Sequence, residues 1–164
     1  MIVILTQCFP SRLGGIESLV SNLAIGLSKS EKVIVFADQH NIIHDDIFDN
    51  NHKDKILIKR IGGIKFFRRR KKIKAIKPLI ESKQVSLVIG DSWKSLELCV
   101  DYLNTNKVPT VCLAHGNVYL SQQESKIHRI SKTLRKTSLV IANSQFTTTL
   151  IKNLNIPNIK IEYI

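Results

Sequence analysis

The chain has 164 residues, with 25 Lys or Arg against 13 Asp or Glu, so its formal net charge is +12. Hydrophobic residues make up 43% of it, which suits one ordinary core and excludes a disordered tail, a collagen-like repeat and a disulfide-stapled mini-protein. The three cysteines lie too far apart for a metal knuckle or a disulfide framework, and no secretory signal or membrane-spanning run is seen, so we expect a cytoplasmic protein.

Short apolar runs rich in Ile and Val recur along the chain and predict strands that are covered on both faces. They are Ile2–Leu5, Val33–Phe36, Ile56–Ile58, Val85–Ile89, Thr110–Leu113, Leu139–Ala142 and Ile159–Ile161. The residues Ile16 to Leu27 repeat an apolar position every three or four residues, which predicts a helix with one buried face. Weaker helical patterns follow at Phe66–Glu81, Lys94–Leu103, Ser121–Lys136 and Gln145–Leu154.

Pro78 has no backbone N–H, so we expect the helix over Phe66–Glu81 to kink or stop near Lys77. The stretch Asp38–Lys55 shows little periodicity and is predicted to be a long loop, whose histidines match no standard metal spacing. Strands and helices alternate throughout, which predicts an α/β fold with a doubly wound, mostly parallel, Rossmann-like sheet and helices on both faces. The last run, Ile161–Ile164, reads as an unfinished domain, so we expect further sequence to follow it.

The positive charge is concentrated in one segment. Twelve basic residues and one acid lie between Lys53 and Lys77, a net +11, which leaves +1 for the remainder. Such a segment on a balanced domain indicates one directed anionic partner. In the helix predicted there, cations surround an apolar stripe, as in helices that lie on an anionic membrane surface. The candidate membrane-docking residues are Arg68, Arg69, Arg70, Lys71, Lys72 and Lys74.

Two other interpretations of the basic helix stay open. In the first, the apolar stripe packs on the sheet and the cations are simply solvated. In the second, the partner is a nucleic acid, which the limited aromatic content and the lack of a recognised nucleic-acid module disfavour.

Glycine and polar residues follow four of the predicted strands, where ligands of open α/β sheets bind. They include Gly14, Gly15 and Glu17 after the first strand, then Asp91, His115 and Ser144 after the fourth, fifth and sixth. Because the carboxyl ends of parallel strands share one edge, we expect these segments to converge there. The dinucleotide and P-loop fingerprints are absent, which disfavours an NAD dehydrogenase and a P-loop NTPase.

Each of these residues has a functional and a structural interpretation. Gly14 and Gly15 before a helix can bring backbone N–H groups to a diphosphate, or can simply form a turn. His115 can bond a substrate, or be satisfied by nearby backbone. Ser144 can bond a ligand, or cap the helix that follows it.

Taken together, these segments resemble the N-terminal domain of family 4 glycosyltransferases of the GT-B type. The matching residues are Phe9-Pro10, Gly14-Gly15-Ile16-Glu17, Asn22-Leu23-Ala24, Val33-Ile34-Val35, His115-Gly116 and Val140–Phe146. The similarity covers essentially the whole chain, whereas the Glu-x7-Glu motif of the family's C-terminal domain has no counterpart. The resemblance implies that residues 1–164 form the acceptor-side domain, and that a C-terminal GT-B domain, in cis or in trans, holds most of the donor.

The resemblance also implies a function. It is the retaining transfer of a hexose from a UDP- or GDP-sugar to a lipid-linked, polysaccharide or lipopolysaccharide acceptor, with no cofactor and no obligatory metal. Gly14 and Gly15 would admit the donor diphosphate, His115 would touch the transferred sugar as the catalytic residue, and Asp91, Ser144 and Glu17 would line the cleft. We expect a peripheral protein on the inner face of the cytoplasmic membrane, inactive without its second domain. The alternative is a non-catalytic module that binds an anionic surface or a partner subunit through the basic helix.

Overall fold

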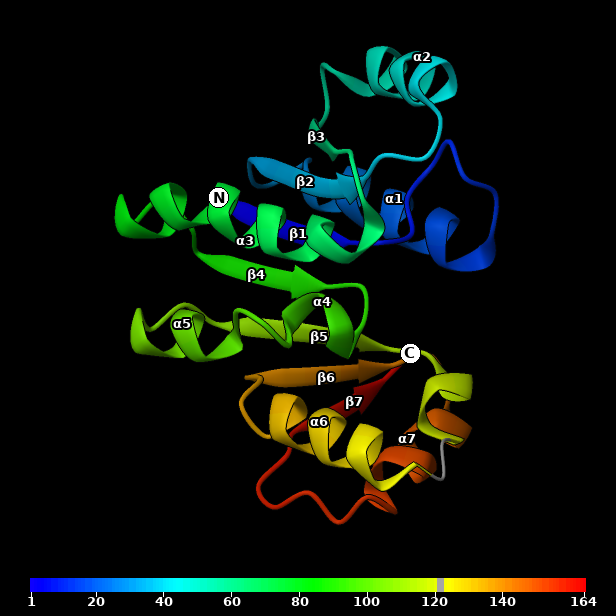
Figure 1. Ribbon diagram of the computed structural model, residues 1–164, viewed down its shortest axis with the longest axis vertical. Helices are drawn as coiled ribbons and strands as arrows, with labels where there is room; N and C mark the ends of the chain where they lie inside the picture. The colour runs from blue at the N-terminus through cyan, green and yellow to red at the C-terminus, as the bar shows by residue number, and fades with distance from the viewer. Residues whose placement is uncertain (121–122) are drawn as a thin grey trace.

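The computed structural model describes residues 1–120 and 123–164 and shows one parallel sheet between helices (Figure 1). The strands are β1 (Ile2–Thr6), β2 (Val33–Asp38), β3 (Leu57–Ile61), β4 (Leu87–Gly90), β5 (Thr110–Ala114), β6 (Leu139–Ala142) and β7 (Ile161–Tyr163). Their order in the sheet is β3-β2-β1-β4-β5-β6-β7, and every pairing is parallel. The predicted doubly wound, Rossmann-like α/β fold is confirmed, and the strand order reverses between β1 and β4.

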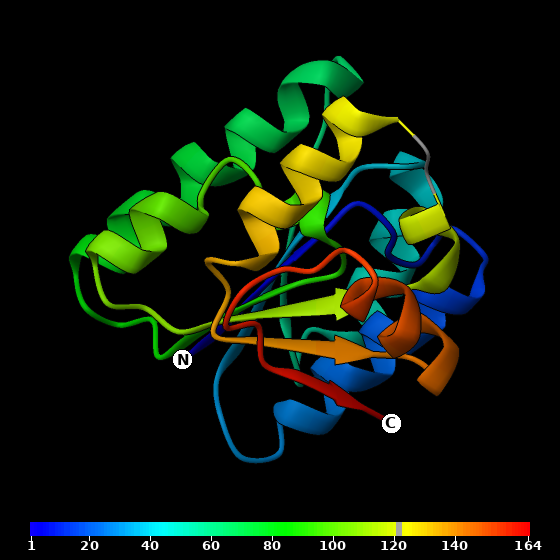
Figure 2. The same cartoon turned by 90° about the horizontal axis from the view of Figure 1, so that it is seen from below.

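The helices are α1 (Gly15–Leu27), α2 (Ile42–His52), α3 (Lys65–Glu81), α4 (Trp93–Leu96), α5 (Val100–Thr105), the 3-10 turn η1 (Gly116–Leu120), α6 (Glu124–Leu134) and α7 (Gln145–Lys152). Figure 2 shows α3, α5 and α6 on one face of the sheet and α1 on the other. The short helix α7 packs against η1 and β7, near the carboxyl ends of the last strands.

The core lies on both faces of the sheet, which explains the unbroken apolar runs. In β1, Val3 and Leu5 belong to the cluster beneath the layer of α3, α5 and α6. Their neighbours Ile2 and Ile4 belong to the cluster beneath α1. Successive strand residues point to opposite faces, so a strand covered on both sides needs apolar residues at every position.

The segment predicted to be a long loop contains the helix α2, so that prediction was wrong. Asn41 caps the helix, because its side chain accepts a hydrogen bond from the His44 backbone N–H at 3.1 Å. Three of its apolar residues, Ile42, Ile43 and Ile47, are exposed, so no continuous buried stripe marks the helix in the sequence. Phe48, which packs edge-on against Phe9, and the contacts of the buried Asp45 attach α2 to the rest of the domain.

Other helix boundaries also differ from the prediction. The helix α3 runs through Pro78 to Glu81, because a proline so close to the end removes few backbone hydrogen bonds. The helix predicted at Lys94–Leu103 is divided into α4 and α5. The predicted start of the next helix, at Ser121, lies outside the described residues.

Candidate functional site

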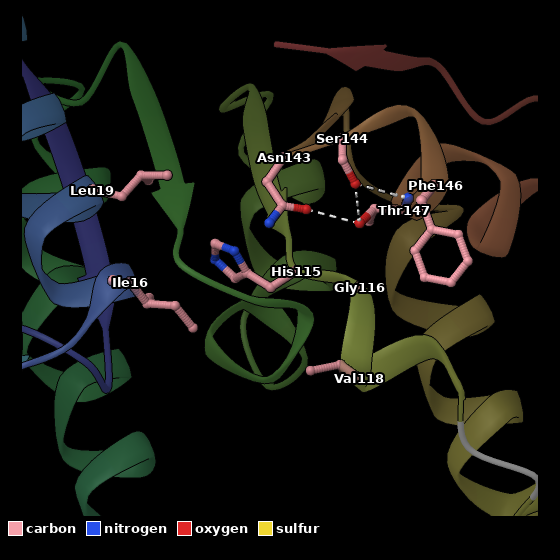
Figure 3. A pocket seen from close by; sticks show the side chains of 10 residues that line it. Ile16, Leu19, His115, Gly116, Val118, Asn143, Ser144, Phe146 and Thr147 are labelled. Carbon is pink, nitrogen blue, oxygen red and sulfur yellow. Dashed lines mark hydrogen bonds between the residues drawn. The ribbon is translucent and has the colours of Figure 1, made fainter.

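A cleft of about 610 Å³ opens at the carboxyl edge of the sheet, between the start of α1 and the ends of β5 and β6 (Figure 3). Ligands of a parallel sheet usually bind at the strand ends, beside the point where the strand order reverses. The helix α1, which forms one wall of the cleft, follows β1, and β1 is one of the two strands at that point. The residues that line the cleft are Gly15, Ile16, Leu19, His115, Gly116, Val118, Asn143, Ser144, Phe146 and Thr147.

The two glycines have different roles at the start of α1. Gly15 is the first helical residue and lines the cleft, and a Cβ built on it would meet nothing within 4 Å. Gly14 is the N-cap and gives no side-chain hydrogen bond to the first turn. A Cβ on Gly14 would lie 2.2 Å from Glu17 Oε2, so a larger residue here would displace this carboxylate. The positive end of the α1 dipole thus faces the cleft.

Glu17 lies away from the cleft that it was predicted to line. Glu17 is 4% exposed, and its Oε1 forms an ion pair with Arg12 Nε at 3.0 Å. The carboxylate packs over Gly14 and ties the loop before α1 to the helix. Glu17 therefore shapes the glycine turn instead of contacting a ligand.

His115 lies at the centre of the cleft, and Figure 3 shows its ring turned toward α1. Its Nε2 is 3.0 Å from the backbone oxygen of Asp91. A carbonyl oxygen can only accept, so Nε2 carries a proton and donates it to this bond. In the neutral ring, Nδ1 then has the free lone pair and can accept a hydrogen bond from a sugar hydroxyl. Both interpretations of His115 therefore hold: Nε2 is satisfied by nearby backbone, and Nδ1 is free to bond a substrate.

Asp91 lies beneath the cleft rather than on its wall, which corrects the prediction that it lines it. It is 2% exposed, and both carboxylate oxygens are fully engaged. The donors are the Thr6 hydroxyl (2.7 Å), the backbone N–H groups of Gln7 (2.8 Å) and Cys8 (3.2 Å), and the hydroxyls of Ser92 (3.2 Å) and Ser95 (2.5 Å). Asp91 therefore joins the loop after β1 to the end of β4, while its carbonyl orients His115.

Ser144 lines the cleft and also caps α7, so both of its interpretations hold geometrically. Its hydroxyl accepts from the Thr147 N–H at 3.1 Å and lies 3.0 Å from Thr147 Oγ1. Thr147 Oγ1 in turn donates to Asn143 Oδ1 at 2.8 Å. This bond fixes the Asn143 amide so that its NH₂ group points toward the His115 ring on the same side of the cleft (Figure 3). Asn143 was named in the sequence only as part of the segment Val140–Phe146, and its role as a donor in the cleft was not predicted.

Phe146 and Thr147 complete the α7 wall and were not predicted as cleft residues. Phe146 is 61% exposed and presents its ring at the rim. An aromatic residue two positions after the strand-end residue Ser144 was the signal in the sequence that could have identified it. Aromatic faces of this kind give flat apolar surfaces for stacking.

The six predicted docking residues of α3 differ in their exposure to solvent, and Lys72 is described separately below. Arg70, Lys71 and Lys74 are exposed. Arg68 and Arg69 are half-buried and form ion pairs with Asp38 and Glu97.

Lys72 is the clear correction in this helix. The residue is 4% exposed, and its ammonium group contacts Asp38 Oδ1 and the backbone oxygen of Thr6 beneath the helix. Burial lowers the pKa of Lys72 below its ordinary value, although Asp38 opposes this shift. A side chain held in this way is not available to a membrane surface.

The described part of the chain contains no helix long and apolar enough to cross a bilayer. Within residues 1–120 and 123–164, no group of His, Cys, Asp and Glu side chains is arranged to hold a metal ion. His40 and His44 lie at the start of α2, beside a separate groove.

The cleft therefore combines a helix N-terminus, an oriented imidazole, an amide NH₂ group and an exposed aromatic ring. Helix N-termini favour anions, and fixed donors and acceptors suit a polyhydroxylated ligand. This set of groups fits a phosphorylated sugar better than an apolar ligand.

Comparisons with known proteins show what this fold is similar to. Three solved structures share the fold at low sequence identity, and this chain spans less than half of each of them. Anabaena HepE in complex with UDP-glucose has a TM-score of 0.71 and 15% identity, over 100% of this chain and 43% of that one. Sucrose-phosphate synthase from Thermosynechococcus elongatus has a TM-score of 0.73 and 14% identity, over 99% and 47%. The lipopolysaccharide outer core galactosyltransferase WaaB, in its apo form, has a TM-score of 0.63 and 15% identity, over 99% and 44%.

No curated protein sequence matches the chain. The sequence profile of Glycosyltransferase Family 4, in contrast, matches residues 13–164, which is most of the chain and includes every residue of the cleft. The chain therefore belongs to Glycosyltransferase Family 4 and forms an N-terminal-like half of a GT-B fold.

Proposed function

We propose that this chain is the acceptor-side domain of a retaining glycosyltransferase that moves a hexose from a UDP- or GDP-sugar to a lipid-linked or polysaccharide acceptor at a membrane surface. The second, donor-binding domain is supplied in cis or in trans. The reaction uses no cofactor and no obligatory metal.

One observation carries this proposal: the cleft joins the α1 N-terminus and the His115 ring at the carboxyl edge of the sheet. The departing nucleotide diphosphate gains negative charge as the glycosidic bond breaks, and the first-turn N–H groups near Gly15 stabilise that charge. His115 Nδ1 accepts a hydrogen bond from a hydroxyl of the transferred sugar and so holds the sugar ring in place. A family match and the UDP-glucose complex of Anabaena HepE support a nucleotide-sugar donor.

The membrane part of the proposal is supported by the beginning of α3. Ile64, Phe66 and Phe67 are 70%, 72% and 45% exposed, and the exposed cations Arg70 and Lys74 lie on the same helix. Each basic residue near an anionic surface contributes on the order of 1 kcal/mol, and exposed aromatic side chains add apolar contact. Of the six cations predicted to dock, Lys72 is left out because it is buried.

The test uses the native gene product that contains residues 1–164. It is incubated with membrane extract and radiolabelled UDP- or GDP-hexoses, and the anomeric configuration of the product is read by NMR. We expect transfer with retention, and a loss of about 100-fold or more in His115→Ala if the ring acts on the reacting sugar. No transfer from any donor, or robust turnover by residues 1–164 alone, would contradict the proposal.

Gly15→Ala and Gly26→Ala form a matched pair in the same assay. Both glycines lie in α1 and have open space where a Cβ would be, but only Gly15 lines the cleft. We expect Gly15→Ala to lower transfer and Gly26→Ala to leave it unchanged, while both variants fold.

The concentration of cations on α3 favours one alternative, a non-catalytic module that binds an anionic surface or a partner subunit. In that case vesicle binding would depend on α3, and His115→Ala would change nothing that can be measured.

A further inference from the structure

A second concave site lies at the carboxyl edge of the sheet, on the side of α3, α4 and α6. It is a recess of about 430 Å³, called the basic recess below, and five cations line it: Lys65, Arg69, Arg70, Lys94 and Arg129. They come from three helices that are far apart in sequence, so the fold and not a local charge run gathers them. None of them lines the cleft of His115.

The basic recess contains only two acids, so most of the positive charge of its five cations is uncompensated. Asp38 also lines it, but its carboxylate is already paired from behind by Lys72 and, at 3.8 Å, by Arg68. Glu97 accepts from Arg69 at 2.6 Å and from Arg129 at 2.6 and 2.9 Å. With five cations and two acids, the lining carries a formal +3.

Three of the cations have no carboxylate partner in the described part of the chain: Lys65, Arg70 and Lys94. Arg70 stacks on Phe66, with the guanidinium carbon 5.4 Å from the ring centroid, and Lys94 lies over Trp93 at 5.8 Å. These aromatic contacts hold the cations near the recess without neutralising them.

The basic recess also contains polar atoms that lack a partner. Gln7 Nε2 and Arg69 Nε are buried and make no hydrogen bond to any described residue. A buried N–H group without an acceptor is costly, and both residues line the recess. A bound group with several acceptor oxygens would satisfy them.

We propose that the basic recess binds a phosphate or pyrophosphate group carried by the acceptor. Several acceptor oxygens and a charge of two or three match the unpaired donors and the net charge of the lining. The assignment of that group to the acceptor rests on the proposed transferase function, whereas phosphate binding by the recess does not.

The two concave sites are linked through one loop. The backbone N–H of Gln7 donates to Asp91, whose carbonyl orients His115, while the Gln7 side chain lines the basic recess. An acceptor whose phosphate sits in the recess is therefore anchored beside the loop that supports the cleft.

Binding to the basic recess can be measured by intrinsic fluorescence, because the chain has a single tryptophan, Trp93. Trp93 is fully buried, and Lys94 Nζ and Arg129 Cζ lie 5.8 and 5.4 Å from its ring centroid. Tryptophan fluorescence of this chain, titrated with inorganic pyrophosphate, measures occupancy of the recess. We expect a saturable change.

Two charge-matched double variants of α3 test the location. Lys65→Gln with Arg70→Gln removes two cations of the recess, and Lys71→Gln with Lys74→Gln removes two exposed cations outside it. We expect the first pair to weaken pyrophosphate binding at least about tenfold and the second less than about twofold, because contact charges act strongly and distant ones are screened. Thermal unfolding followed by circular dichroism verifies that both fold.

The absence of a saturable change, or an equal loss in both double variants, would overturn the proposal. Transfer activity without pyrophosphate binding would overturn this proposal alone and leave the transferase function standing. Pyrophosphate binding in a protein without transfer activity would overturn the transferase function and leave phosphate binding by the recess standing.

Competition distinguishes the two sources of the phosphate. Vesicles of phosphatidylcholine with phosphatidic acid are added to the chain with bound pyrophosphate. Displacement of the bound pyrophosphate that persists in the Lys71→Gln, Lys74→Gln variant supports a lipid-linked phosphate. Vesicle binding that leaves the pyrophosphate in place supports a soluble phosphorylated acceptor.

Discussion

Replacing Lys72 by Met removes the buried cation of α3 and leaves its partners behind. The Lys72 and Asp38 side chains are 5% and 12% exposed, so this ion pair is shielded from water. The Thr6 carbonyl loses its contact with the ammonium group at the same time. Among the described residues, Asp38 keeps only Arg68 as an ion-pair partner, with Nη1 of Arg68 3.8 Å away.

Removing one partner of a buried ion pair costs about 3–5 kcal/mol. Because Asp38 retains Arg68 and some contact with water, we expect the lower end, about 3 kcal/mol. For a domain of this size, each kcal/mol corresponds to about 2–4 °C in Tm, so Lys72→Met is expected to melt about 6–12 °C lower. Urea unfolding gives the free energy, and calorimetry gives the Tm.

Lys74→Met is the matched control, because Lys74 is exposed on the same helix. It is expected to change the free energy of unfolding by less than about 0.5 kcal/mol. Adding Asp38→Asn to Lys72→Met removes the stranded charge and is expected to restore part of the loss. If Lys72→Met and Lys74→Met have the same Tm, the burial argument for Lys72 is refuted.

Three further predictions concern stability. Burial acts to raise the pKa of Glu97, but hydrogen bonds from the two arginines beside it hold that pKa below its ordinary value. The resulting stability is present above about pH 4.5 and lost as the pH falls through the folded-state pKa, so acid unfolding of Glu97→Gln is expected to lack this component. Gly90→Ala places a Cβ 2.6 Å from Leu96 Cγ and is expected to lower the free energy of unfolding in urea by about 1–3 kcal/mol. Gly26→Ala lies at an open helical position and is expected to raise that free energy by about 0.5–1 kcal/mol. Asp91→Ala removes an acceptor from five donors, of which only the Thr6 hydroxyl and the Cys8 N–H have another in the described part of the chain, and is expected to cost more than about 3 kcal/mol in the same measurement. A smaller loss is expected in Asp91→Asn, and equal losses would contradict the charge-assisted bonds.

The strands and the helix α1 could be predicted from the sequence because their signals are local. Strand residues buried on both faces are apolar one after another, as in Ile2–Leu5. A helix with one buried face repeats apolar residues every three or four positions. The strand ends follow from the strands, so the region of His115 and Gly15 was predictable as well. The helix α2 was missed because one apolar residue, Phe48, and the polar contacts of Asp45 attach it to the domain, and these form no periodic apolar stripe.

The roles of individual polar residues depended on the tertiary structure. Asp91 and Ser144 both follow strands, but the donors that surround Asp91 come from the loop after β1 and from α4, which the sequence does not place together. Lys72 lies in a run of cations and differs from Lys71 only in the direction of its side chain on the helix, which turns it toward Asp38. By itself the sequence determined the sheet, the edge that holds the cleft and the family, because these depend on periodicity and order along the chain. Only the tertiary structure assigned burial, charge pairing and the basic recess, because these depend on which distant segments meet.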